Sequence, residues 1–275
     1  MPGKLGEHDR RVRFEVNQMP WKELTKLLVT HLAGFDSDEM DPSIHTALLV
    51  EPDSTNRAVP RTRIMTKTIG QILWNLDLSE QWQNHHRLFQ TLSRDPRARG
   101  FLGDFFEPAF HALCVRGADF RIYPSLRTEQ RVYYHFTSDR FNETGSEGLS
   151  LRQYSQTPFN HKTRPISDLL ANHYYQPVTL NNPSYDSFIY DANSHRISAF
   201  QVTVERDHDL VEEGVEELCA LGRRLQINDL KIRIIVVVLQ NAQITYKIKK
   251  TLFHDLEGLE VYFLEVTEDQ LYSFT

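Results

Sequence analysis

The pattern of apolar and polar positions changes along the chain and divides it into two regions. In the first 95 residues apolar side chains recur at helical spacing. The clearest examples are Trp21, Leu24, Leu28 and Leu32. A second such stretch covers about 67–93, whereas residues 35–64 are loop-like, with one short apolar run at Ala47–Val50. We therefore expect residues 1–95 to form a mainly helical N-terminal segment.

From about residue 100 helical and strand-like patterns follow one another. The spacing predicts a helix over 101–115, disturbed by Pro108, and strands over 119–123 and 131–136. Residues 137–165 are polar and indicate a long loop-like excursion from the sheet. A short helix is expected near 166–172.

The most informative pattern lies beyond residue 185. Residues 186–190 and 196–204 are typical of two strands, and the turn chemistry of 191–194 joins them into a hairpin. A helix follows, with an apolar stripe and a capping box formed by Asp209 and Glu212. The stripe consists of Val211, Val215, Leu218 and Leu225.

The β-branched run 231–239 predicts a strand buried on both faces, and 259–266 a final strand. Because helices and strands alternate in this way, we expect residues 96–275 to form one α/β domain, a mixed sheet flanked by helices.

Composition and charge narrow the possibilities. The 275 residues are 40% hydrophobic and 25% charged, as in ordinary globular proteins, and the net charge of −6 gives no general attraction to nucleic acid. Two cysteines exclude a disulfide framework and fit a reducing compartment. The longest apolar run, 234–239, is too short to span a membrane, and the polar residues 1–13 predict no secretory signal. We expect an intracellular protein without a membrane partner.

Candidate chemistry gathers on the predicted hairpin. Asp186 opens its first strand, and Gln201, Thr203 and Glu205 follow at alternate positions on or just beyond its second strand, so that they share a face. A strand that lines a cleft gives this pattern, and so does a strand that faces solvent. The residues alone leave both interpretations open.

Glu107 adds a carboxylate within an apolar helical segment, and His111 follows one turn later on the same helix. Either the two side chains face a common site, or Glu107 is a solvated surface residue. A Mg²⁺ site needs one or two such carboxylates together with water and substrate oxygens.

Taken in order, these residues resemble a known family. The chain resembles the C-terminal domain of Crinkler-type effectors in an ordered set of motifs, and retrotransposon hot spot proteins have a similar arrangement. These motifs are Pro183-Ser-Tyr-Asp186, a hairpin, Phe200-Gln-Val-Thr-Val204 and His208. The resemblance covers roughly residues 95–267 and implies a restriction-endonuclease-like fold of the PD-(D/E)XK nuclease superfamily.

The family pattern implies roles for particular residues. The family has a Glu in an early helix, an Asp at the start of a strand, a Gln-x-Thr strand and a later His. In this chain the matching residues are Glu107, Asp186, Gln201 with Thr203, and His208. Glu107, Asp186 and Gln201 would hold Mg²⁺ or Mn²⁺, with Thr203, Glu205 and His208 completing the catalytic site.

Two departures weigh on this assignment. Where the superfamily usually has Glu-x-Lys, this chain has Gln201-Val-Thr203; the amide adds no charge, and Thr203 cannot replace the lysine. Relatives also often carry a P-loop ATPase before this domain, and no G-x-x-x-x-G-K-[ST] motif is present here.

Two hypotheses follow. The preferred one is a metal-dependent DNA endonuclease that acts as an effector or toxin in the nucleus or cytoplasm, including that of a host cell. The alternative is a catalytically inactive module of the same fold that binds nucleic acid or a host protein. The matching order of Glu107, Asp186 and His208 favours the first, and the Gln and Thr replacements favour the second.

Overall fold

The computed structural model describes twelve stretches of the chain. They are residues 48–52, 60–64, 89–90, 99–129, 133–137, 145–151, 154–160, 163–178, 184–205, 207–242, 244–250 and 259–272. The chain divides into two compact units, Met1–Ala109 with Phe274–Thr275, and Phe110–Ser273. Each unit is described by itself below.

The first unit contains an antiparallel hairpin of β1 (Leu48–Pro52) and β2 (Pro60–Ile64), with Val50 opposite Thr62. The loop-like interpretation of residues 35–64 is therefore wrong for these two strands. The predicted N-terminal helices lie outside the described residues except at Phe89 and Gln90, which are helical. The expected domain boundary near residue 95 stays a prediction.

Helix α5 (Arg99–Arg116) confirms the helix predicted over 101–115 and accommodates Pro108 within it. The division between the two units falls inside this helix, after Ala109. Its last turns, from Phe110 onward, belong to the second unit.

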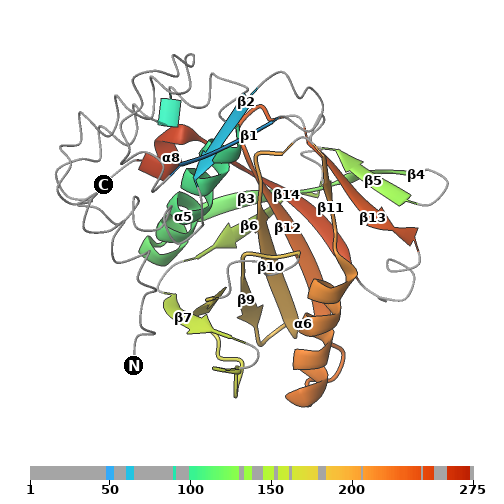
Figure 1. Ribbon diagram of the computed structural model, residues 1–275. Coiled ribbons are helices and arrows are strands. Elements are labelled where there is room, and N and C mark those ends of the chain that lie inside the picture. The colour runs from blue at the N-terminus through green and yellow to red at the C-terminus, as the bar shows by residue number, and fades with distance from the viewer. Residues whose placement is uncertain are drawn as a thin grey trace, which may run out of the picture. The chain divides into compact units, whose positions relative to one another are not determined.

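The second unit is an α/β structure built on an eight-stranded mixed sheet (Figure 1). In spatial order its strands are β6 (Glu147–Ser150), β3 (Asp119–Pro124), β14 (Glu260–Val266), β12 (Lys231–Leu239), β10 (Arg196–Val202), β9 (Ser187–Asp191), β8 (His173–Pro177) and β7 (Ser155–Phe159).

The middle of this sheet agrees with the sequence. Strands β9 and β10 form the predicted antiparallel hairpin, with Phe200 opposite Ser187. Helix α6 (Glu212–Arg224) then leads to β12, which pairs in parallel with β10 on one side and with β14 on the other. Strand β12 is therefore an interior strand, which agrees with the prediction that residues 231–239 form a strand buried on both faces.

A smaller sheet of four strands lies beyond the end of β10. Its order is β11 (Asp207–Asp209), β13 (Thr245–Lys249), β5 (Tyr133–Thr137) and β4 (Leu126–Glu129). A short helix, α8 (Glu268–Tyr272), follows β14.

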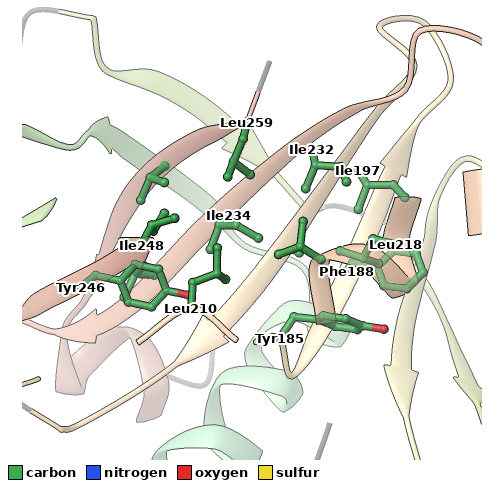
Figure 2. Packing of buried hydrophobic residues seen from close by; sticks show 14 of the residues in the cluster. Tyr185, Phe188, Ile197, Leu210, Leu218, Ile232, Ile234, Tyr246, Ile248 and Leu259 are labelled. Atoms are coloured by element: carbon green, nitrogen blue, oxygen red, sulfur yellow. The ribbon is translucent and has the colours of Figure 1, made fainter. Parts of the chain in front are cut away.

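One face of the large sheet is covered by α6 and by residues of the small sheet. Alternate residues of β10 and β12, among them Ile197, Ile232 and Ile234, pack with Leu218 of α6 in one apolar cluster (Figure 2). Tyr246 and Ile248 of β13 belong to the same cluster. Alternation along the strands thus assigns every second residue to this covered face.

The opposite face packs against the last turns of α5. The ring of Phe200 lies 5.5 Å from that of Phe110 and 6.2 Å from that of Tyr174, measured between centroids. Both faces of the central strands are therefore buried, as the β-branched composition of β12 predicts.

Several local predictions are wrong. The polar stretch 137–165 contains strands β6 and β7, and residues 166–172 form no helix but lead through a turn into β8. The strand predicted over 196–204 ends at Val202. The cap of α6 also differs, because the N-cap residue is Val211, no side chain of the predicted box caps the helix, and Asp209 lies on β11.

Candidate functional site

The open end of the β9–β10 hairpin brings two of the candidate residues into contact. Asp186 directly precedes β9, and its backbone N–H donates to the carbonyl of Phe200 at 2.7 Å. Its carboxylate oxygen Oδ2 accepts hydrogen bonds from Gln201 Nε2 at 3.1 Å and from the Val202 backbone N–H at 2.7 Å. Asp186 and Gln201 thus form one polar pair where the two strands end.

Gln201 lies on the sheet face that α6 covers. It alternates with Phe200 and shares its face with Ala199 and Ile197, and it stands opposite Val236 of β12. Only 8% of its surface is exposed. The carboxylate of Asp186 only accepts, so the amide NH₂ must point toward it and Oε1 away from it. Within the part of the chain that the structure describes, Oε1 has no hydrogen-bond partner.

Thr203 and Glu205 do not continue the strand face on which they were expected. Because β10 ends at Val202, the alternation stops there. The hydroxyl of Thr203 is buried and accepts a hydrogen bond from the Glu205 backbone N–H at 3.1 Å, which closes a turn. Glu205 itself is exposed. Thr203 therefore shapes the chain after the hairpin, and Glu205 stands at the surface.

His208 lies on the neighbouring sheet. It is half-buried on β11, opposite Tyr246 of β13, and the two ring centroids are 5.8 Å apart. Burial lowers the pKa of His208, and the negative charges of Glu205 and Asp209 oppose that shift in part. The imidazole is thereby kept neutral to lower pH than an exposed histidine.

Tyr246 is a residue of this region that the sequence interpretation missed. Its side chain is fully buried, and no described residue forms a hydrogen bond with its hydroxyl. Burial raises the pKa of the phenol, and the nearby carboxylates of Asp186 and Asp209 raise it further. The alternation of Thr245–Lys249 is a signal that indicates a strand, but nothing in it indicates which residues the strand approaches.

Glu107 lies on the part of α5 that belongs to the first unit and is half-buried. Its convergence with Asp186 stays a prediction. His111 is buried against the sheet, where its Nδ1 and the Tyr174 hydroxyl are hydrogen-bonded at 2.7 Å. The same hydroxyl is bonded to Ser187 Oγ at 2.6 Å. Because Ser187 alternates with Asp186, this network lies on the face opposite Gln201, and His111 does not face the polar pair.

The pair offers a cation one carboxylate and one neutral amide oxygen, which are the oxygen donors that hard divalent ions prefer. Among the described residues, no group of three or more His, Cys, Asp or Glu side chains is arranged to hold a metal ion. The two side chains thus carry suitable donor atoms, but Oε1 of Gln201 points away from the Asp186 carboxylate, so a shared ion would require the amide to turn over. Further ligands would have to come from water, substrate or residues elsewhere in the chain.

The chain matches no protein-family model, no curated protein and no solved structure. Of the helices in the described stretches, none is both long and apolar enough to cross a membrane.

Proposed function

We propose that this protein is a metal-dependent endonuclease of the restriction-endonuclease-like class, which hydrolyses phosphodiester bonds of DNA. The observation that carries the proposal is the contact of Asp186 with Gln201 at the open end of the hairpin. These two residues stand at corresponding positions of the pattern by which the chain resembles the Crinkler-type effectors.

The fold around the pair supports the same assignment. In chain order the protein has helix α5, the antiparallel hairpin β9–β10, the covering helix α6 and the parallel strand β12, with strands β3 to β8 between α5 and β9. The resemblance implies a mixed sheet flanked by helices, with its acidic residues on the hairpin, and this arrangement agrees with it.

The side chains of the pair have distinct tasks in this proposal. Two donors, the side-chain amide of Gln201 and the backbone N–H of Val202, hold the Asp186 carboxylate in one orientation. Together with Gln201 Oε1, and with Glu107 as the third ligand, it would hold Mg²⁺ or Mn²⁺. A bound divalent ion supplies charge neutralisation at the phosphate and makes water a stronger acid.

A second candidate function is a non-catalytic module of this fold that binds nucleic acid or a host protein. One observation favours it: Oδ2 of Asp186 accepts a hydrogen bond from the backbone of Val202, so the residue also fastens the end of β10 to the start of β9. Such a residue serves the fold whether or not a metal binds. Action in the nucleus or cytoplasm, including that of a host cell, belongs to both candidates.

The first prediction distinguishes these functions through Asp186→Asn. The asparagine keeps an acceptor for the Val202 N–H, and the Gln201 amide can turn over to accept from the new NH₂, but the charge is lost. We expect the wild-type chain to cleave supercoiled plasmid with Mg²⁺ or Mn²⁺ but not with EDTA, and the Asp186→Asn variant to lose cleavage while its circular dichroism spectrum is unchanged.

Asp186→Ala is a less suitable control. It leaves the Val202 N–H and the Gln201 amide without their acceptor, at a cost of about 1–3 kcal/mol for each buried group. Cleavage that persists in Asp186→Asn would refute the site assignment. If the wild-type chain cleaves DNA with neither Mg²⁺ nor Mn²⁺, and Asp186→Asn binds DNA as tightly as the wild type does, the second candidate would be established instead.

A further inference from the structure

Among the described residues of the second unit, the buried polar side-chain atoms without a hydrogen-bond partner include Oε1 of Gln201 and the hydroxyl of Tyr246. The Tyr246 side chain is fully buried, and Gln201 is 8% exposed. A buried polar group without a partner costs free energy, and native proteins usually satisfy such groups with ordered water. Two such groups in one region therefore indicate a common polar ligand.

Both atoms lie on the same side of the large sheet. Gln201 shares its strand face with Ala199 and Ile197, and these residues belong to one apolar cluster with Tyr246. Tyr185, which directly precedes Asp186, is in this cluster too. In Figure 2 the hydroxyl of Tyr246 points toward Leu210 and the middle of the cluster, not toward its edge.

The chemical character of the two atoms is complementary. Burial raises the pKa of the Tyr246 phenol, and the carboxylates of Asp186 and Asp209 raise it further, so the phenol keeps its proton and is a donor. Gln201 Oε1 is an acceptor, because the NH₂ end of the amide is bonded to Asp186. A water molecule can accept two hydrogen bonds and donate two, so a single water can satisfy the donor and the acceptor together.

We propose that Tyr246 is a third residue of the Asp186–Gln201 site, and that its phenol O–H, Gln201 Oε1 and the Asp186 carboxylate hold one water molecule between them. The catalytic consequence rests on the proposed function: Tyr246 is a positioning residue that orients a water of the nuclease site from β13. The Tyr246 phenol would supply a hydrogen-bond donor to the water, a function that Thr203 cannot provide in place of the lysine in the superfamily's Glu-x-Lys pattern.

The sign of a stability change tests the proposal without any enzymatic activity. If Tyr246 holds a water, Tyr246→Phe should lower the thermal midpoint of the full chain by about 2–4 °C. If the hydroxyl has no ligand, removing it should leave the midpoint unchanged or raise it, and this would overturn the proposal. Tyr190→Phe, which removes the same atom from a tyrosine of the same apolar cluster, is the matched control and should change the midpoint little.

A double-mutant cycle tests whether the two groups share their ligand. Gln201→Met replaces the amide by an apolar side chain of similar volume. If one water bridges the residues, the effects of Tyr246→Phe and Gln201→Met on unfolding should be non-additive, whereas Tyr190→Phe should add to Gln201→Met. A crystal structure should show an ordered oxygen within about 3.2 Å of both atoms. The bridging water would be refuted if the effects of Tyr246→Phe and Gln201→Met on the free energy of unfolding were additive, or if the crystal structure showed no ordered oxygen between the two residues.

Activity gives the last measurement. In a wild-type chain that cleaves DNA, Tyr246→Phe should lower kcat by about ten- to a hundredfold with KM for DNA unchanged, because only the position of the water is lost. An unchanged kcat would contradict the positioning role. A wild-type chain that cleaves nothing would instead refute the proposed function, and the stability cycle and the crystal structure would still decide whether Tyr246 belongs to the site.

Discussion

Gln201 is the residue that decides the charge of the proposed site, because in the nuclease pattern that the chain resembles a glutamate usually takes this position. Its amide donates to Asp186 and stabilises the carboxylate by a hydrogen bond without adding a second negative charge. The pair is thus stable with no cation present, since no like charges meet. In the proposed function the pair, with its single negative charge, would bind a divalent ion weakly, because affinity follows the charge of the ligands.

The prediction at this scale concerns Gln201→Glu. A second carboxylate beside Asp186 should repel it, so the variant should melt at lower temperature than the wild type in EDTA. Mn²⁺ should relieve the repulsion, and its affinity should rise roughly tenfold or more, since ligand charge sets affinity at such sites. Calorimetric titration with Mn²⁺ and melting curves with and without the ion measure both effects.

The matched control for this variant is Gln156→Glu. Gln156 is exposed on β7, where it donates a hydrogen bond to Gln176. This substitution adds the same charge away from the pair and should alter neither the affinity for Mn²⁺ nor its effect on melting. Equal affinity in Gln201→Glu and the wild type would show that the pair binds no cation.

At the scale of the element, the start of α6 is fastened by a residue far from it in sequence. The N-cap position is Val211, which offers no polar side chain. Instead the hydroxyl of Ser184 accepts a hydrogen bond from the Val211 N–H at 2.8 Å and donates one to its carbonyl. Ser184 lies two residues before Asp186, so this contact ties the loop of the polar pair to the helix.

We predict that Ser184→Ala destabilises the protein by about 1–2 kcal/mol, because both hydrogen bonds of its hydroxyl to the Val211 backbone are lost. Ser184 has a φ of 71°, in the left-handed region where a Cβ is strained and glycine is not. Ser184→Gly loses the same hydrogen bonds but relieves this strain, so it should be less destabilising than Ser184→Ala. Urea unfolding of the three proteins gives the order, and a neutral Ser184→Ala would refute the role of the hydroxyl.

The elements that the sequence predicts are those with a local signature. The hairpin, α6 and β12 follow from turn residues, a helical stripe and a β-branched run, and these place Asp186 beside Gln201. Strand β13 carries a short alternating pattern, but its pairing with β11 joins residues far apart in the chain. No local pattern contains that pairing, and Tyr246 was missed for this reason. The contact of Ser184 with Val211 is hidden in the same way, because it too joins residues far apart in the chain.

At the scale of the whole second unit, an ion cluster around the buried Arg233 and two partly exposed carboxylates connects three strands of the large sheet. Arg233 of β12 is buried between Glu147 of β6, at 2.9 Å, and Glu260 of β14, at 3.2 Å. Its guanidinium also lies 4.3 Å from the ring centroid of Tyr262, whose hydroxyl donates to Glu147. A buried arginine without these partners would be costly, so the cluster makes the sheet sensitive to the charge of its carboxylates.

Glu147 and His208 both contribute to the response of the second unit to acid, as does Asp191, whose pKa is lowered chiefly by the hydrogen bond from Ser194. Partial burial by itself raises the pKa of Glu147, but the hydrogen bond from Tyr262 and the charge of Arg233 outweigh it, and the net shift is downward from 4.5. Glu147 therefore contributes stability that is present above pH 4.5 and is lost as the pH falls through the lowered pKa. His208, whose pKa is lowered from 6.5 by burial, binds protons more readily in the unfolded chain, so its effect begins below pH 6.5.

The final prediction is that the free energy of unfolding falls in two stages between pH 7 and pH 3. The first stage, below about pH 6.5, comes from His208 and should be absent in His208→Gln. The second, below about pH 4.5, includes the contribution of Glu147, and Glu147→Gln should make it shallower while lowering stability at pH 7, because Arg233 then lacks one of its two carboxylates. Urea unfolding of the three proteins at intervals of pH measures both stages. The sites lie on different sheets, so the two effects should add in the double variant; a single variant that altered both stages would contradict the assignment.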